Sequence, residues 1–241
     1  MKIFAHRGSS LIWPENTMLA FDNADNAGAT GFETDLRLSK DGEIVLSHDD
    51  NLGRFGQADK TISELTEEEI TAIEICSIDG QFKDKLISLK TLLQKYPQKD
   101  YIFDCKFSGQ LLFVRLKELL SEIKFHDRFW FLNWSGKGGK HVRNFFPQQA
   151  SFPRVARTGI WGGLSIFGLG HLSEPKNSIL ALPVYFNHFP VFSGRQIASI
   201  ARRKKTFVGY LVNSEKEFRQ CETKAVEIVL TDRPDLITKL L

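Results

Sequence analysis

The 241 residues include 32 Lys and Arg against 29 Asp and Glu, which gives a formal net charge of +3, and 42% of them are hydrophobic. This composition is ordinary for a globular protein and excludes a disordered or collagen-like chain, while the small overall basic excess gives no reason to expect nucleic-acid binding. The length suits one large α/β barrel better than two average domains. We therefore expect one domain over residues 1–241 and no nucleic-acid partner.

Cysteine usage and hydropathy indicate the compartment. The three cysteines are far apart and form no Cys-x-x-Cys pair, which argues against a disulfide framework and against a zinc site of that type. Only three apolar residues, Ile3–Ala5, precede His6 and Arg7, too few for the core of a signal peptide. No apolar run approaches the roughly 20 residues of a transmembrane helix. We expect a cytoplasmic protein without a transmembrane segment, and the sequence carries no signal for its oligomeric state.

Short apolar runs alternate with amphipathic stretches in the first half of the chain, a pattern typical of βαβ units around a parallel sheet. The predicted strands are 3–5, 32–38, 44–46 and 101–103, and the predicted helices are 16–27, 86–96 and 111–123. A turn at 40–43 precedes the strand 44–46, which either returns antiparallel along the strand before it or continues as the next strand. The looser segment 51–98, with short capped helical turns, follows His48.

The second half continues the alternation. The predicted strands are 128–132, 152–155, 179–185, 206–212 and 226–230, and the predicted helices are 139–146, 194–205 and 215–223. The glycine-rich stretch 158–177 fits either a short apolar helix or a loop. About eight strands with helices between them predict an α/β fold, a single (β/α)8 TIM barrel with a short insertion after the His48 strand. Its working face would be the carboxyl end of the strands.

Paired carboxylates stand on two of these strands. Glu33 and Asp35 are two residues apart, so both side chains point to the barrel interior, and Asp104 and Lys106 repeat the spacing on a later strand. Close carboxylates stay ionised together when a hard cation lies between them, and an all-oxygen set suits Mg²⁺ or Ca²⁺ better than Zn²⁺. We expect one divalent cation at Glu33, Asp35 and Asp104, with a solvated strand end as the alternative.

Two histidines stand where predicted strands end. His6 follows the first strand and His48 follows the strand 44–47. Imidazoles with an ordinary pKa near 6.5 can act as general acid and general base at neutral pH, as phosphodiester cleavage requires, although a lone histidine is more often structural. Arg7 offers a planar fork of donors for a phosphate oxygen, and Lys106 would offset charge in the transition state.

Short motifs in the first 54 residues resemble, in order and spacing, the amino-terminal signature of the glycerophosphodiester phosphodiesterase family. They are HRG at 6–8, PENT at 14–17, AF at 20–21, GFETD at 31–35, KDG at 40–42 and HDDNLGR at 48–54. Near the other end, 212–213 and 231–234 are similar to the family's last two strand ends. The resembling motifs therefore lie near both ends of the chain and enclose nearly all of it.

The resemblance implies a barrel of the type described and a metal-dependent hydrolysis of glycerophosphodiesters to glycerol 3-phosphate and an alcohol. It implies that His6 and His48 form the acid/base pair. It also implies that Glu33 and Asp35 bind the metal and that Arg7 contacts the phosphate. The expected partner is a small-molecule glycerophosphodiester.

The sequence also departs from the family pattern. The usual Glu-x-Lys of the third main strand is here Asp104-Cys105-Lys106, one methylene shorter toward the metal, with Cys105 expected to face the helices. Positions 133–134 also differ, as do Tyr210 and Leu211 in the stretch 210–213, at the part of the mouth where the alcohol would lie. Two alternatives stay open. One is a phospholipase D-like cleavage of a lysophospholipid or sphingolipid head group, which the aromatic segment 185–192 would favour, and the other is a non-catalytic barrel that binds a phosphorylated ligand.

Overall fold

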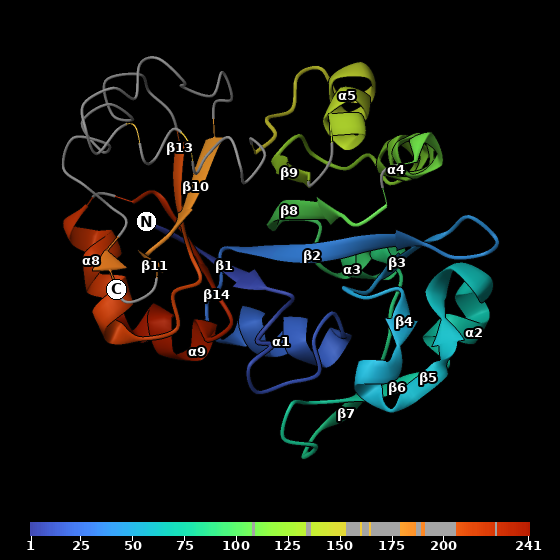
Figure 1. The fold of residues 1–241 in the computed structure, drawn as a ribbon, viewed down its shortest axis with the longest axis horizontal. Coiled ribbons are helices and arrows are strands. Elements are labelled where there is room, and N and C mark those ends of the chain that lie inside the picture. Colours follow the sequence, from blue (N-terminus) through green and yellow to red (C-terminus); the bar gives the residue numbers. More distant parts are fainter. Residues whose placement is uncertain are drawn as a thin grey trace.

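The computed structural model describes residues 1–107, 109–133, 136–152, 160, 164, 179–186, 189–190, 206–224 and 226–241. Its main strands are β1 (Lys2–His6), β2 (Gly31–Leu38), β8 (Asp100–Cys105), β9 (Phe129–Asn133), β10 (Ile179–Pro183), β13 (Thr206–Tyr210) and β14 (Ile228–Thr231). Within the described residues, these seven strands pair in parallel in the order β10-β13-β14-β1-β2-β8-β9 (Figure 1). The predicted α/β architecture of a parallel-stranded barrel is confirmed.

Helices connect these strands and lie outside the sheet (Figure 1). They are α1 (Met18–Asn26), α3 (Leu89–Lys95), α4 (Gln110–Glu122), α5 (Gly136–Phe145), α8 (Glu215–Thr223) and α9 (Pro234–Ile237), followed by the single turn η4 (Thr238–Leu240). Side-chain oxygens cap three of them, since Thr17 accepts from the Ala20 backbone amide, Ser88 from the Thr91 backbone amide and Ser214 from the Glu217 backbone amide. No helix in the part of the chain that the structure describes is long and apolar enough to cross a membrane.

The part of the barrel interior farther from the carboxyl ends of the strands is an apolar layer. Phe4, Ile102, Val208 and Ile228, from four different strands, belong to one buried cluster. Gly31 of β2 makes room for it, because a Cβ at that position would lie 2.5 Å from the ring of Phe4. Side chains alternate between the two faces of a strand. The next inward positions of β1, β2 and β8 therefore fall in the layer above, toward the carboxyl ends of the strands.

The outward face of the same strands packs against the helices through aromatic rings. The ring centroid of Tyr101 lies 5.9 Å from that of Phe32 and 5.6 Å from that of Phe103, and all three rings are fully buried. Cys105 belongs to this cluster, as predicted, and burial raises the pKa of its thiol well above the usual value. With Cys105 facing the helices, Asp104 before it faces the interior.

The insertion predicted after His48 forms a small unit with its own core. Its elements are β4 (Asn51–Leu52), η1 (Gly53–Phe55), β5 (Gln57–Thr61), η2 (Ile62–Glu64), α2 (Glu67–Thr71), β6 (Glu74–Cys76) and β7 (Lys83–Lys85). Ile62, Ile70 and Ile75 are buried together there against Val45 of β3 (Ile44–Leu46). The insertion is thereby anchored to the barrel.

Several predicted elements differ from those observed. β3 runs antiparallel to β2 and is no barrel strand, because the turn closed by the Gly42 amide on the Ser39 carbonyl reverses the chain. Where a strand 152–155 is predicted, Ser151 makes a single parallel bridge to Phe131, and 153–155 lie outside the described residues. The predicted strand 179–185 ends at Pro183, and β11 (Tyr185–Phe186) pairs antiparallel with β12 (Phe189–Pro190). The predicted helix 194–205 and most of the stretch 158–177 also lie outside the described residues.

Candidate active site

The parallel register brings together side chains predicted from three separate strands. His6 of β1 pairs with Glu33 of β2, and Asp35 of β2 pairs with Asp104 of β8. All four occupy the inward positions above the apolar layer, and the three carboxylates are buried. One oxygen from each of Glu33, Asp35 and Asp104 lies within 4.8 Å of the others. The structure thus places the three predicted metal ligands around one point.

Two cations lie against these carboxylates. Lys106 Nζ is 2.6 Å from Asp104 Oδ2 and 3.1 Å from Asp35 Oδ1, so it bridges neighbouring strands. Arg7 Nε forms an ion pair with Asp35 Oδ2 at 3.0 Å, and the side-chain amide of Asn16 donates a 2.8 Å hydrogen bond to the same oxygen. These charges outweigh the effect of burial and lower the pKa of Asp35. Asp35 is therefore ionised at neutral pH.

Glu33 has a different environment. Its side chain is 1% exposed, and its Oε2 accepts no hydrogen bond from the residues that the structure describes. Burial raises the pKa of Glu33 to about 8, against the lowering effect of His6 and with a further increase from Asp35 and Asp104. A buried carboxylate oxygen without a donor is costly, and a cation beside it removes that cost. The all-oxygen set of Glu33, Asp35 and Asp104 fits a hard divalent cation.

Arg7 reaches the carboxylates through an unusual backbone conformation. Its φ is 56°, in the left-handed region, and Gly8 follows with φ of 82°. Gly8 is required there, because a Cβ would lie 2.6 Å from Ala20 of α1. Contacts of the guanidinium with Asp35 and with Glu15, 3.2 Å away, hold the conformation. Strained residues persist where the surroundings determine them, often at functional sites.

His6 is held by a residue from the far end of the chain. A ring N–H at Nδ1 donates to Asp232 Oδ1 over 2.6 Å, and Asp232 also accepts from the Asn213 amide at 2.7 Å and from the Ser10 hydroxyl at 3.0 Å. Nε2 then points to Glu33, with 3.7 Å to Oε2. Burial lowers the pKa of His6, but Glu33 and Asp232 outweigh burial and leave it above 6.5.

His48 reaches the same place from the insertion. β1, which ends at His6, and β3, whose end precedes His48, both pair with β2 and not with each other. The Arg7 amide donates to the Glu33 carbonyl at 2.9 Å, and the Ser47 amide donates to the Asp35 carbonyl at 3.1 Å. Because β3 is antiparallel, its end returns toward the end of β1.

A chain of ion pairs links His48 to Arg7. His48 Nδ1 lies 2.7 Å from Asp49, whose other oxygen accepts from Arg54 Nε at 2.8 Å. Both terminal nitrogens of Arg54 donate to Glu15, at 2.8 and 2.7 Å, and Glu15 also accepts from Arg7. All of the site residues predicted from the sequence are thus joined directly or through this chain.

Four of these partners, Asp232, Asp49, Arg54 and Asn16, had no role in the sequence interpretation. Asp232, Arg54 and Asn16 stand in the family motifs, while Asn213 was expected to line the mouth and instead holds Asp232. Their place in those motifs was the one available signal. Of the other mouth positions singled out, the side chain of Asn133, residue 134 and residues 187–188 and 191–192 lie outside the described residues.

Comparison with known proteins agrees with this arrangement. The model of the glycerophosphoryl diester phosphodiesterase family matches residues 6–129, more than half of the chain. YqiK of Bacillus subtilis, an uncharacterized protein, is 37% identical over 113 residues, which are 46% of this chain and 46% of YqiK, so the chain spans about half the length of that relative. Mouse lysophospholipase D GDPD3 is 33% identical over 275 residues, covering 100% of this chain and 82% of GDPD3.

A solved structure shows the same fold. A phosphodiesterase from Oleispira antarctica, in complex with the product sn-glycerol-3-phosphate, superposes with a TM-score of 0.76 at 20% identity, covering 100% of this chain and 96% of that one. At that identity the likeness establishes the barrel fold. The family match and the full-length relative establish more: the chain belongs to the glycerophosphoryl diester phosphodiesterase family, whose members are phosphoric diester hydrolases.

Proposed function

We propose that this chain hydrolyses glycerophosphodiesters to glycerol 3-phosphate and an alcohol, with one divalent cation, Mg²⁺ or Ca²⁺, held by Glu33, Asp35 and Asp104. The observation that carries the proposal is the buried carboxylate trio, with ligand atoms within 4.8 Å of one another. Glycerol 3-phosphate bound to a structural neighbour agrees with this substrate class. When bound, the cation would neutralise phosphate charge and acidify the nucleophile, which is either water or the substrate's neighbouring hydroxyl.

Arg7 and Lys106 would bind the phosphate. Both are already held over Asp35, with Arg7 Nε at 3.0 Å and Lys106 Nζ at 3.1 Å, so no side chain has to travel to meet the substrate. Preorganised cations stabilise the charge that develops on the phosphate oxygens without a reorganisation cost during the reaction. Arg7 is also fixed by Glu15, which leaves its orientation independent of the substrate.

His6 and His48 would move the two protons. Each has its Nδ1 on a carboxylate, Asp232 for His6 and Asp49 for His48, which leaves each Nε2 to exchange a proton with the substrate. One imidazole takes the proton of the nucleophile and the other gives a proton to the departing alkoxide. Either assignment of the two roles is consistent with these contacts.

The test is metal removal and restoration on a natural substrate. Protein stripped with a chelator should not turn over glycerophosphocholine, and added Mg²⁺ or Ca²⁺ should restore turnover. Calorimetric titration of the stripped protein with the same ions should show one site, and Glu33→Gln should weaken it. Full activity of thoroughly metal-free protein would refute the metal assignment.

A second candidate is the removal of a head group from a lysophospholipid. The full-length match to a lysophospholipase D favours it. Competition between glycerophosphocholine and lysophosphatidylcholine separates the two, because the enzyme prefers the substrate with the higher kcat/KM. A chain that binds both without turnover under every metal would instead be a binding barrel.

We also infer that residues 1–241 act as one domain and that the protein works in the cytoplasm. The pairing of β14 with β1 supports the first inference, since it joins the two ends of the chain in one sheet. The three cysteines, none in a disulfide, support the second. Limited proteolysis with a single cooperative unfolding transition would test the domain assignment.

A further inference from the structure

The charges of this chain are distributed unevenly. Between residues 128 and 214 there are twelve Lys and Arg and one acidic residue, Glu174, so this third of the chain carries a formal charge of +11. The whole chain carries only +3, and the remainder is therefore acidic. Fifteen of the 28 aromatic residues also fall in the basic third. A basic and aromatic region on a chain whose remainder is acidic is a candidate for contact with a polyanionic surface.

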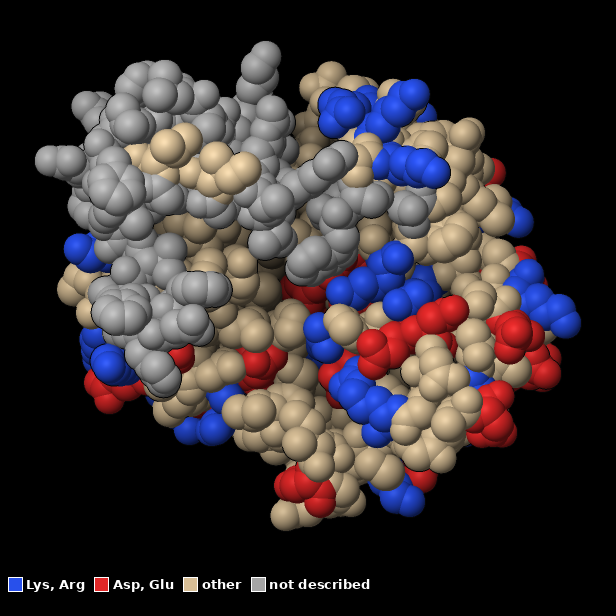
Figure 2. Space-filling model, in the orientation of Figure 1, with Lys and Arg blue, Asp and Glu red and all other residues tan. Residues whose placement is uncertain are grey.

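Helix α5 displays these charges in the described part of the chain. Lys137, Lys140 and Arg143 are exposed, and α5 contains no Asp or Glu. Gly138 and Val142 of the same helix are buried, so the helix is anchored by one side and presents cations on another. No ion pair within the described residues neutralises Lys137, Lys140 or Arg143. Figure 2 shows Lys and Arg atoms gathered over α5 and α4, at the top right of that face.

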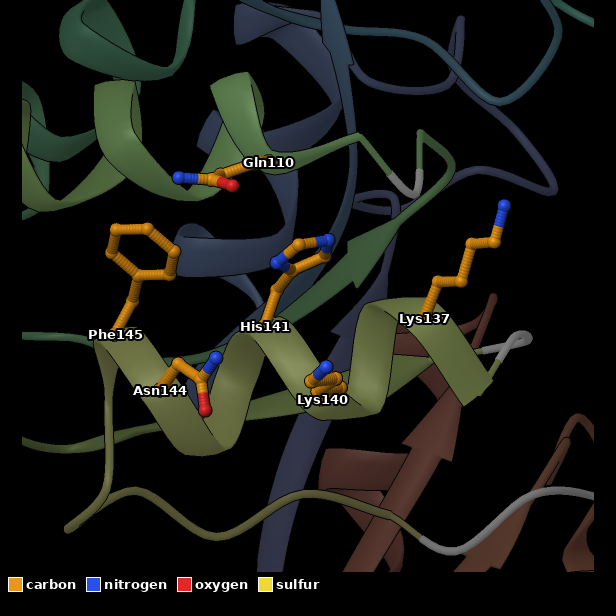
Figure 3. A pocket seen from close by; sticks show the side chains of 6 residues that line it. All are labelled: Gln110, Lys137, Lys140, His141, Asn144 and Phe145. Carbon is orange, nitrogen blue, oxygen red and sulfur yellow. The ribbon is translucent and has the colours of Figure 1, made fainter.

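A pocket lies between α5 and α4. It has a volume of about 370 Å³ and is lined by Gln110, Lys137, Lys140, His141, Asn144 and Phe145. In Figure 3, Gln110 of α4 faces Phe145 and His141 of α5 across the gap between the helices. The ring of His141 stacks on Phe113 of α4 with centroids 5.4 Å apart, which fixes the pocket floor. Ammonium and amide groups around one opening suit a phosphate group.

Two exposed apolar side chains stand close in sequence to Gln110, which lines the pocket. Leu111, next to Gln110 in the first turn of α4, is 50% exposed, and Phe107 is 45% exposed. Phe107 directly follows Lys106, whose ammonium lies on Asp35 and Asp104. Along the chain, Phe107 therefore lies between Lys106 of the carboxylate site and Gln110 of the pocket. Exposed apolar groups beside exposed cations are the combination that binds the interface of an anionic bilayer.

We propose that α5 and the start of α4, through Lys137, Lys140, Arg143, Phe107 and Leu111, dock this enzyme on an anionic phospholipid surface. Lys137 and Lys140 would bind lipid phosphates at the pocket, and Phe107 and Leu111 would enter the interface. Docking would bring the mouth of the active site to the membrane, where diesters released from phospholipids arise.

Vesicle binding tests the proposal independently of catalysis. The protein should co-sediment with vesicles of phosphatidylglycerol and phosphatidylcholine, and not with phosphatidylcholine alone, and high salt should release it. Lys137→Glu with Lys140→Glu should weaken binding at least about tenfold, and Leu111→Ser should weaken it about threefold. The matched control is Lys85→Glu with Lys239→Glu, which makes the same charge change on β7 and η4 and should bind as wild type.

Turnover of soluble glycerophosphocholine should be unchanged in all three variants, because none of these residues touches the carboxylate site. Binding of the Lys137/Lys140 variant at wild-type strength would overturn the proposal. Equal loss in the Lys85/Lys239 control would overturn it as well, since net charge alone would then account for binding. Equally tight binding of a short DNA duplex would assign the surface to polyanions in general and also refute lipid docking.

Discussion

The two halves of the candidate site are built in different ways. In the barrel half, His6 lies at the end of β1 with a side chain that is 17% exposed. It stands between Glu33 of β2 and Asp232, which follows β14. The insertion half carries His48, with a side chain 36% exposed, on a loop tied down by Asp49 and Arg54. Strand register fixes the first half, whereas the second depends on ion pairs that are partly exposed and screened by salt. The paired barrel strands thus hold His6 rigidly, whereas partly exposed ion pairs hold His48 and can adjust more easily.

Removing each histidine in turn is the strongest test of whether both halves of the site take part in catalysis. His6→Ala and His48→Ala should each lower turnover of glycerophosphocholine by roughly 100-fold or more, because each would lose a proton-transfer group. His141→Ala, on α5, should leave turnover unchanged, and circular dichroism should show all three variants folded. A natural diester is needed, since an activated leaving group hides the loss of the acid. Near-parental turnover in either site variant would remove that histidine from the mechanism.

Asp104 tests the rigid half of the site. Asp104→Ala should weaken the affinity for divalent cations at least about tenfold and reduce activity in parallel, because one ligand of the trio is lost. Asp104→Glu should stay active but change the preference between Mg²⁺ and Ca²⁺, since Mg²⁺ tolerates a displaced ligand less than Ca²⁺ does. Titration of both ions into wild type and the two variants measures this. Unchanged affinity and rate in Asp104→Ala would take the residue out of the site.

Arg54 tests the insertion half of the site, which carries His48. Arg54→Ala should lower kcat about tenfold, because Asp49 and Glu15 lose the guanidinium that joins them and His48 loses its fixed position. Affinity for the cation should change less than about twofold, because Arg54 does not contact the carboxylate trio. Arg54→Lys should restore only part of the rate, since one ammonium cannot bind both carboxylates as the fork does. If the affinity for the cation fell as much as the rate, Arg54→Ala would have disrupted the whole site and not only the position of His48.

The smallest effect is expected from backbone positions that do not touch the site. Gly31→Ala should destabilise the barrel by about 1–3 kcal/mol, because the new methyl would lie 2.5 Å from the Phe4 ring and 2.7 Å from the Asp100 carbonyl. Gly56→Ala, in the insertion, meets no atom within 4 Å and should cost only about 1 kcal/mol, from its φ of 78°. Denaturant unfolding of both variants measures the difference. Equal costs would contradict the tight packing described at Gly31.

The sequence predicted the direction in which site residues point better than the partners they meet. Period-two alternation places Glu33, Asp35 and Asp104 on inward faces without knowledge of the neighbouring strand. The hydrogen bond from His6 to Asp232 joins residues 226 positions apart, and it depends on the pairing of β14 with β1, which alternation does not encode. The direction of β3 was left open for the same reason, since a turn at Gly42 allows both courses.

The ion-pair chain through Arg54 was also missed for a physical reason. Charged residues in a loop usually face solvent, and nothing in their spacing distinguishes Arg54 or Glu15 from such residues. Only the fold of the insertion, with its buried isoleucines, brings Arg54 back over the loop after β1. Motif resemblance indicated that these positions matter, and the structure shows what they touch.

The contact between His6 and Asp232 has a consequence for the synthesis of the protein. His6 is synthesised 226 residues before its partner Asp232. At about 5–20 residues per second, that delay is roughly 10 to 45 seconds. During this interval β1 has β2 beside it but lacks β14 at its other edge, and His6 Nδ1 lacks the Asp232 carboxylate that accepts its hydrogen bond. A nascent chain would therefore carry the carboxylates Glu33, Asp35 and Asp104 before His6 gains its contact with Asp232, and the complete candidate site would form only once β14 and Asp232 have been synthesised.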